Sequence, residues 1–256
     1  MKITRRPPKK LGRLFAEPLV VPGFTRRSLR IYLPSDHRED EARPLLFLFD
    51  GQNVFDHQPS FSGGWMTHEA IERLSKKRPH PIVVGLDHGG EGRLSELSPW
   101  TVKGQPGRAD EFLTFVARDL LPGLRARFRV VEGPVGVLLG GSSMGGLAAT
   151  YGHLKYPQAF GGALAMSPSF WVGGAKLLAL VHRHAKPWVS QIYLDCGRDE
   201  GGGKMAPLVE RVAAELRARH YDDDHLKLRI DARGTHSEAA WRRRLLPALR
   251  WFYRPR

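Results

Sequence analysis

A glycine- and serine-rich stretch at residues 136–156, GVLLGGSSMGGLAATYGHLKY, restricts the fold of this chain more than any other part of it. The apolar run at 137–139 is too short for a helix and is bounded by glycines, so it predicts a short buried strand. Residues 147–156 favour a helix, which Pro157 ends because proline cannot continue one. The stretch therefore predicts a strand, a very tight turn and a helix in succession.

The tight turn contains a G-x-S-x-G pattern, residues 141–145, centred on Ser143. In such a turn the serine takes a strained backbone conformation, and the glycines on either side remove Cβ atoms that would collide across the bend. Its hydroxyl then lies above a helix N-terminus, which favours developing negative charge. We therefore predict that Ser143 is a nucleophile. The alternative is a glycine-rich loop in which Ser143 only caps the helix.

The length and composition predict one α/β domain. A chain of 256 residues with 41% hydrophobic content can form a sizeable core. The formal net charge of +14 would attract anionic partners, but the basic residues are scattered, which favours a solvated surface over a nucleic-acid partner. The single cysteine, Cys196, excludes an intrachain disulfide. No signal-peptide pattern follows the basic N-terminus and no apolar run approaches the ~20 residues of a membrane span, so we expect a cytoplasmic protein with no membrane partner.

Alternating strands and helices follow a basic N-terminal arm, which is predicted at residues 1–18. A turn at 22–23 separates two predicted edge strands, at 19–21 and 28–33, that form an antiparallel hairpin. Residues 19–256 then form a single domain with a mostly parallel doubly wound sheet, whose active site lies beyond the carboxyl ends of the strands. The remaining strands are predicted at 45–49, 81–86, 137–139, 161–166, 191–195 and 226–230.

A histidine and a carboxylate are expected near Ser143, because a serine hydroxyl is a poor nucleophile without a base that an acid orients. In α/β-hydrolases the three residues follow in the order serine, acid, histidine. His236, after the last predicted strand, is the predicted base, and a surface histidine near a helix start is the alternative. Asp199 and Glu200 follow the strand at 191–195. The position after the strand-end glycine favours Glu200, with Asp199 as the alternative acid.

An oxyanion hole requires two backbone N–H groups close to the developing charge. One is expected from Met144, directly after the nucleophile, and the other from Gln52, after the strand at 45–49. The alternative for Gln52 is an ordinary Asp-Gly turn. The sequence has no metal-ligand spacing and no phosphate-binding glycine loop, so we predict no metal and no cofactor.

Six motifs extend the pattern over most of the chain. They are LLFLFDGQNVFD (45–56), VVGLDHGGEGRLSELSPW (83–100), GGSSMGG (140–146), AMSPSFW (165–171), YLDCGRDE (193–200) and GTHSEAAWRRRL (234–245). As an ordered set they resemble the enterochelin esterase / esterase D family of α/β-hydrolases. The resemblance implies the α/β-hydrolase fold and acyl transfer through a serine ester. It also implies that Ser143 is the nucleophile, His236 the base, and Gln52 and Met144 the oxyanion donors, and it allows Asp or Glu as the acid.

The resemblance further points to residues that contact substrate. Arg93 and Glu96 match a family pattern at the entrance of the site, and the alternative is a surface salt bridge of little energetic weight. Trp65 and Trp171 are candidates for lining the acyl or alcohol pocket, and the alternative is packing in the core or on the surface.

These features predict a serine carboxylic-ester hydrolase for small-molecule esters with small acyl, aryl or siderophore-type groups. The family also contains acyltransferases, so transfer to an alcohol is an alternative reaction. A non-catalytic basic module that binds polyanions is a further hypothesis, which the presence of serine, histidine and acid together does not favour. The sequence leaves the oligomeric state open.

Overall fold

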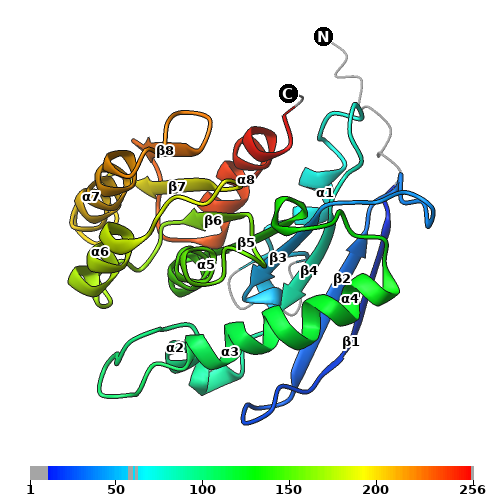
Figure 1. Cartoon of the computed structure of the whole chain (residues 1–256), viewed down its shortest axis with the longest axis horizontal. Helices are drawn as coiled ribbons and strands as arrows, with labels where there is room; N and C mark the ends of the chain where they lie inside the picture. The colour runs from blue at the N-terminus through cyan, green and yellow to red at the C-terminus, as the bar shows by residue number, and fades with distance from the viewer. Residues whose placement is uncertain (1–10, 57–59, 61–62, 255–256) are drawn as a thin grey trace.

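A central β-sheet, with helices packed against it, organises the fold (Figure 1). The computed structural model describes residues 11–56, 60 and 63–254, and within them the sheet has eight strands in the order β1-β2-β4-β3-β5-β6-β7-β8. Strand β2 is antiparallel to both β1 and β4, and the other neighbours are parallel. The prediction of a mostly parallel sheet with an antiparallel N-terminal edge is therefore confirmed. The strands are β1 Arg13–Leu19, β2 Arg27–Leu33, β3 Leu45–Phe49, β4 Ile82–Leu86, β5 Val137–Ser142, β6 Gly162–Met166, β7 Gln191–Gly197 and β8 Leu226–Asp231.

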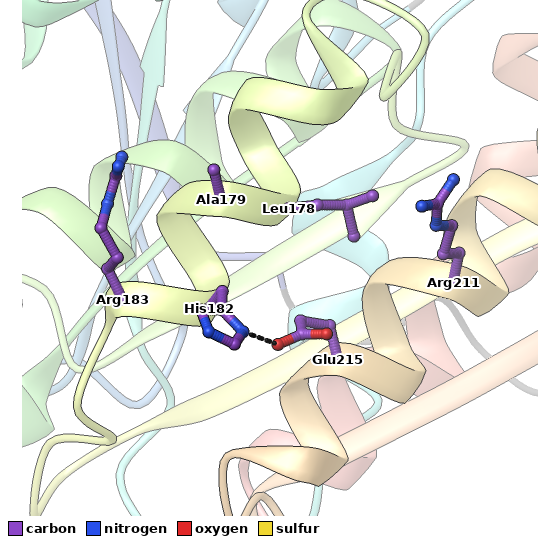
Figure 2. Close-up of a pocket in the computed structure, with 6 residues that line it drawn as sticks. All are labelled: Leu178, Ala179, His182, Arg183, Arg211 and Glu215. Atoms are coloured by element: carbon purple, nitrogen blue, oxygen red, sulfur yellow. Dashed lines mark hydrogen bonds and ion pairs between the residues drawn. The ribbon is translucent and has the colours of Figure 1, made fainter.

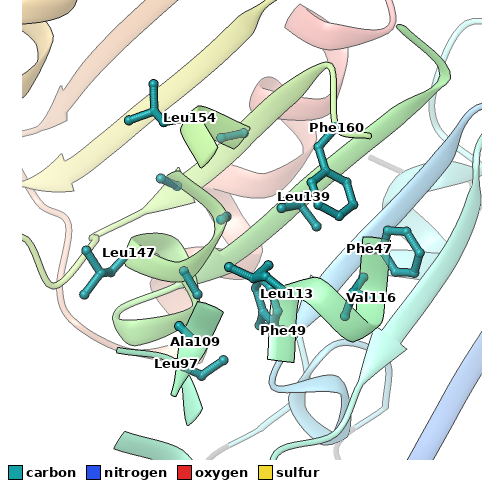
Figure 3. Close-up of a cluster of buried hydrophobic side chains, with 14 of the residues drawn as sticks. Phe47, Phe49, Leu97, Ala109, Leu113, Val116, Leu139, Leu147, Leu154 and Phe160 are labelled. Carbon is teal, nitrogen blue, oxygen red and sulfur yellow. The ribbon is translucent and has the colours of Figure 1, made fainter. Parts of the chain in front are cut away.

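Helices cover both faces of the sheet, which explains why its central strands are continuous apolar runs. Strand β3, with the sequence LLFLF, is buried at every position. Its Phe47 and Phe49 point to one face and join the cluster drawn in Figure 3, whereas Leu46 and Leu48 point to the other face. The helices are α1 Thr67–Ile71, α2 Arg93–Glu96, α3 Ala109–Phe115, α4 Leu121–Arg127, α5 Met144–Lys155, α6 Gly174–Arg183, α7 Met205–Ala218 and α8 Glu238–Phe252.

The two faces are covered by different helices. Buried side chains of α3, α4, α5, α6 and α7 join the cluster of Phe47 and Phe49, and those of α1 and α8 pack on the opposite face. A π turn at Val116–Leu120 joins α3 to α4 directly before Pro122, where the missing N–H prevents regular helical bonding. The proline therefore accompanies a π-helical segment within a continuous helical stretch from Ala109 to Arg127.

The N-terminal edge differs from its prediction. Strand β1 begins at Arg13, inside the segment expected to be an arm, and pairs with β2 from Arg13 to Leu19. As an edge strand it is largely exposed and tolerates Pro18, so it lacks the buried apolar pattern by which a strand is recognised. The boundary at residue 18 is thus too late, and residues 1–10 lie outside the described part of the chain.

Candidate active site

Ser143 occupies the sharp corner between β5 and α5. Strand β5 ends at Ser142 and helix α5 begins at Met144, which leaves Ser143 with φ 55° and ψ −119°. This conformation is rare for a residue with a side chain and is tolerated at functional sites. Glycine is required at position 141 because a Cβ there would lie 2.7 Å from the carbonyl carbon of Gly145. The predicted elbow is therefore present, with Ser143 at its apex.

The side chain of His236 is joined to Glu200. Its Nδ1 lies 2.8 Å from Glu200 Oε2, and Glu200 is almost completely buried. Asp199, the alternative acid, is exposed. The two loops that carry Glu200 and His236 follow the adjacent strands β7 and β8, so parallel pairing brings them to the same edge of the sheet.

Ser143 and His236 line one pocket of about 340 Å³. Within the described residues, the Ser143 hydroxyl is hydrogen-bonded to the hydroxyl of Ser169, at 3.2 Å, and not to His236. The rest of the pocket combines apolar side chains with one guanidinium. The other lining residues are Arg93, Leu94, Met144, Trp171, Gly201 and Met205.

The carboxylate of Glu200 is surrounded by hydrogen-bond donors. Its Oε1 accepts from the hydroxyl of Ser167 and from the N–H of Gly197, both at 2.8 Å. Burial by itself would raise the pKa of Glu200, but the hydrogen bonds from His236, Ser167 and Gly197, with the charge of Arg244, hold that pKa below its ordinary value. Glu200 is thus an ionised acid whose Oε2 faces the imidazole.

The two predicted oxyanion donors lie at the ends of neighbouring strands. Met144 begins α5 and lines the pocket, and Gln52 lies in the one-turn 3-10 helix Gly51–Asn53 that follows β3. Strands β3 and β5 are paired in parallel, which brings both segments to the same edge. The side chain of Gln52 accepts a hydrogen bond from the N–H of His88, at 3.2 Å, so its amide is tied to the loop after β4.

Two of the four predicted substrate-contact residues reach the pocket. Arg93 lines it while donating two hydrogen bonds to Asp50, at 2.6 and 2.7 Å. Trp171 also lines it and is half exposed.

The other two predicted contacts, Glu96 and Trp65, lie elsewhere. Glu96 is buried and accepts two hydrogen bonds from Arg27, at 2.7 and 2.8 Å, because a carboxylate that is removed from water needs such partners. Trp65 is 2% exposed and packs on Trp241 in the core. Neither side chain lines the entrance of the pocket, so these two predictions are corrected.

Several residues around the site were not predicted. Asp50 follows the apolar strand β3, and Ser169 lies in the AMSPSFW motif, but nothing in their own positions identifies a contact partner. Arg244 belongs to the Arg242–Arg244 run, which suggests a solvated surface. It nevertheless lies three residues after the buried Trp241 and four before the buried Ala248 on α8, so helical spacing places it on the buried stripe.

A second hollow, between α6 and α7, contains none of the predicted site residues (Figure 2). Its volume is about 450 Å³, and His182 Nδ1 lies 3.0 Å from Glu215 Oε1 across it. Its lining residues include no serine, threonine or cysteine. In the described part of the chain, no three His, Cys, Asp or Glu side chains are grouped to hold a metal ion. No described helix is both long and apolar enough to cross a membrane.

An eight-stranded sheet of this topology, with a serine at the β5–α5 elbow and a histidine–glutamate pair at the same edge, defines an α/β-hydrolase fold. The chain belongs to the esterase family described as "Putative esterase", whose model matches residues 25–252, and it is an ester hydrolase.

The chain is also similar to curated proteins and, in its fold, to solved structures. The chain is 24% identical to the uncharacterized protein YbbA of Bacillus subtilis, over 89% of this chain and 92% of YbbA. It is 28% identical to the iron(III) enterobactin esterase of Escherichia coli strain K12, over 84% of this chain and 51% of that protein. The chain thus spans about half the length of that esterase. The crystal structure of the BES protein from Bacillus cereus matches 98% of this chain and 99% of its own, with a TM-score of 0.75 and 18% identity.

Proposed function

We propose that the chain is a serine carboxylesterase that uses Ser143, His236 and Glu200. The observation that carries this proposal is the 2.8 Å contact between His236 Nδ1 and Glu200 Oε2, with the elbow serine in the same pocket. The carboxylate fixes the tautomer of the imidazole, because the proton on Nδ1 is committed to Glu200. The other ring nitrogen, Nε2, is then free to act as the base.

The first half of the reaction forms an acyl-enzyme. Ser143 Oγ attacks the ester carbonyl carbon while its proton passes to His236 Nε2, after the serine side chain turns from Ser169 toward the imidazole. The backbone N–H groups of Met144 and Gln52 stabilise the negative oxygen of the tetrahedral intermediate. When the intermediate collapses, the C–O bond to the alcohol breaks and the alcohol leaves with the proton from His236.

The second half releases the acid. Water loses a proton to His236 Nε2 and attacks the acyl carbon, and collapse returns the proton to Ser143 Oγ as the acid departs. Throughout the cycle Glu200 stabilises the imidazolium and stays ionised.

The lining of the pocket favours an ester with an apolar or aromatic group. Leu94, Met144, Trp171 and Met205 supply apolar surface, and the volume of about 340 Å³ suits one small acyl or aryl group at a time. The names of the enterobactin and salmochelin esterases among the relatives extend the proposal to siderophore-type esters. The guanidinium of Arg93, although paired with Asp50, would lie beside an acidic part of such a ligand.

Substitution of the serine tests the proposal. We expect Ser143→Ala to lower kcat for p-nitrophenyl acetate by about a thousandfold or more and to abolish labelling by a fluorophosphonate probe. Ser142→Ala is the matched control, because Ser142 is the neighbouring hydroxyl at the end of β5, and it should remain labelled. Unchanged turnover by a folded Ser143→Ala protein would contradict the mechanism. If the unlabelled wild-type protein gives mainly transesterified products when an alcohol is supplied, the chain is an acyltransferase.

A further inference from the structure

Arg244 is a buried cation directly behind the proposed catalytic acid. Its side chain is 1% exposed and projects from α8 toward the ends of β6 and β7. Its Nη2 donates to Ser167 Oγ at 2.8 Å, its Nη1 lies 3.4 Å from Glu200 Oε1, and its Nε lies 3.6 Å from Asp195 Oδ2. A guanidinium with so little access to water needs polar and ionic partners of this kind to be tolerated in the interior.

The hydroxyl of Ser167 connects this cation to the acid. It donates to Glu200 Oε1 at 2.8 Å while it accepts from Arg244 Nη2 at 2.8 Å and from the indole N–H of Trp241 at 3.0 Å. Two donors from α8 therefore orient the hydroxyl so that its own proton points at Glu200. With Oε1 occupied in this way, Oε2 is left to face His236.

Arg244 also lies close to the loop that carries His236. A Cβ at Gly234 would be 2.6 Å from Arg244 Nη1, and a Cβ at Gly197 would be 2.1 Å from the carbonyl oxygen of Gly234. The absence of side chains at these two positions lets the acid loop, the histidine loop and the guanidinium pack together. Arg244 is therefore packed against both the loop that carries Glu200 and the loop that carries His236.

We propose that Arg244 is a positioning residue, which holds the carboxylate of Glu200 ionised and turned so that Oε2 faces His236. This proposal rests on the proposed esterase mechanism, because it assigns Arg244 a role through Glu200 and not through substrate. The competing explanation is that Arg244 only fastens α8 to the sheet.

Below about pH 7, Asp195 does not cancel the charge of Arg244. Burial raises the pKa of Asp195 to about 7, against the opposing effects of Arg244 and of the Ser167 N–H. Below that pH Asp195 is largely protonated, so the guanidinium acts mainly on Glu200. Other charged groups also lie around the cluster of Asp195, Glu200, His236 and Arg244, on β8, α2 and α8. They are Arg229, Asp231, Arg93 and Glu238, with Arg243 beside Asp231.

The test compares Arg244→Gln with Arg244→Lys and with Arg43→Gln. Arg43 is the matched control, because it is equally buried and ion-paired, with Asp36 and Glu41, but precedes β3 at the opposite end of the sheet from the site. The readouts are kcat/KM for p-nitrophenyl acetate from pH 5 to 9, and the far-downfield proton resonance of a His Nδ1–H that is bonded to a carboxylate. The resonance does not depend on turnover.

We expect Arg244→Gln to lower kcat/KM about tenfold or more, and to shift the acid limb of its pH profile upward by about half a pH unit or more. Without the cation, the negative charge around His236 favours the protonated imidazole, which cannot act as a base. Arg244→Lys restores the charge and should return the acid limb close to its wild-type position. The downfield resonance should weaken or move in Arg244→Gln and persist in Arg43→Gln, which should also keep the wild-type profile per folded molecule.

A folded Arg244→Gln protein with the wild-type profile and resonance would overturn the proposal, and so would equal shifts in Arg244→Gln and Arg43→Gln. If Arg244→Gln does not fold, Ser167→Ala tests the proposal instead. This variant keeps every charge and removes only the hydroxyl that connects Arg244 to Glu200. An unchanged rate and resonance in Ser167→Ala then overturn the proposal, and a several-fold loss with a moved resonance supports it. Failure of the esterase mechanism itself is distinguished by Ser143→Ala, which would then retain its activity.

Discussion

At the scale of single residues, burial distinguishes the two candidates for the acid of the proposed catalytic set. Glu200 and Asp199 are adjacent in sequence, but the first points inward to His236 and the second is exposed. Spacing after the strand could only favour one of them. The contact between Glu200 and His236 depends on how the chain turns after β7. The sequence pattern of β7 alone does not specify that turn.

We expect Glu200→Gln to lower kcat for p-nitrophenyl acetate by about a hundredfold to ten-thousandfold, because an amide can no longer stabilise the imidazolium or fix its tautomer. Asp199→Asn, the matched control, should stay within about twofold of the wild type, since an exposed neighbour does not contact the imidazole. Steady-state kinetics of the three proteins at one pH is sufficient. Equal losses in both variants would remove Glu200 from its assigned role.

Asp195 makes the stability of the protein depend on pH. Burial raises its pKa from 3.8 to about 7, so between these values the folded chain holds a proton that the unfolded chain has lost. The folded state binds more protons in this window, and the contribution of Asp195 to the free energy of unfolding therefore falls as pH rises.

We expect Asp195→Asn to gain stability relative to the wild type, by roughly 1–4 kcal/mol, between pH 4.5 and pH 8, because asparagine does not ionise. Urea unfolding of both proteins at the two pH values measures this change. Asp199→Asn, which removes an exposed carboxylate from the loop after the same strand, provides the control. A constant gap between Asp195→Asn and the wild type would show that Asp195 ionises in the folded state as it does in the unfolded chain.

At the scale of elements, the strands that are buried on both faces were the most predictable. Strands β3, β4 and β6 consist of apolar residues and glycine, and β5 and β7 contain apolar runs at 137–139 and 192–194. The order of these runs along the chain predicts a parallel sheet. The place of Ser143 was predictable because it follows such a strand, and that of His236 because it lies in the loop after the last strand, β8. Strand β1 was missed because an exposed edge has no such pattern.

Side chains that act through long-range contacts were less predictable. The sequence predicts Glu96 and Trp65 at the pocket. In the structure Glu96 accepts hydrogen bonds from Arg27 and Trp65 packs on Trp241, and both partners are distant in sequence. The role of Arg244 was not predicted from the Arg242–Arg244 run, because its partners are also distant in sequence. Local spacing places a residue on a helix or at a strand end, and only the packing of α8 and α2 on the rest of the fold determines its partner.

The turn after Glu200 requires glycine. Residues 201–203 are three successive glycines with φ of 61°, 66° and 77°, a left-handed turn that residues with side chains rarely adopt. We expect Gly202→Ala to lower the free energy of unfolding by about 1 kcal/mol, although space for the Cβ is open. Gly123→Ala in α4, where the Cβ is also unobstructed and φ is not positive, should instead raise it by about 0.5–1 kcal/mol.

Chemical denaturation of both variants tests this contrast, and it separates backbone conformation from packing because neither added methyl group meets another atom. If Gly202→Ala were as stable as the wild type, the left-handed turn would not persist in solution.

At the scale of the whole molecule, the site exists only in the completed fold. Its residues come from the ends of β3, β5, β6, β7 and β8 and from α8, and helices on both faces hold those strands in register. Ser143 and His236 are separated by more than ninety positions in the sequence. We therefore expect esterase activity and tertiary structure to be lost together in denaturant, because no local element contains the nucleophile and its base.

The net charge of +14 acts on the molecule as a whole and predicts a dependence on salt that is specific to anionic substrates. Raising the ionic strength from about 10 to about 150 mM shortens the screening length from roughly 30 to roughly 8 Å, which removes most of the long-range attraction. We expect kcat/KM for 4-acetoxybenzoate to fall about threefold or more over this range, while that for phenyl acetate stays nearly constant. The two esters share an acetyl group and differ in the charge of the alcohol, so each controls for direct effects of salt on the catalytic residues. Equal responses would mean that the positive charge surrounds the fold without acting at the pocket, as expected if Asp50 neutralises Arg93 and the remaining arginines are screened by solvent.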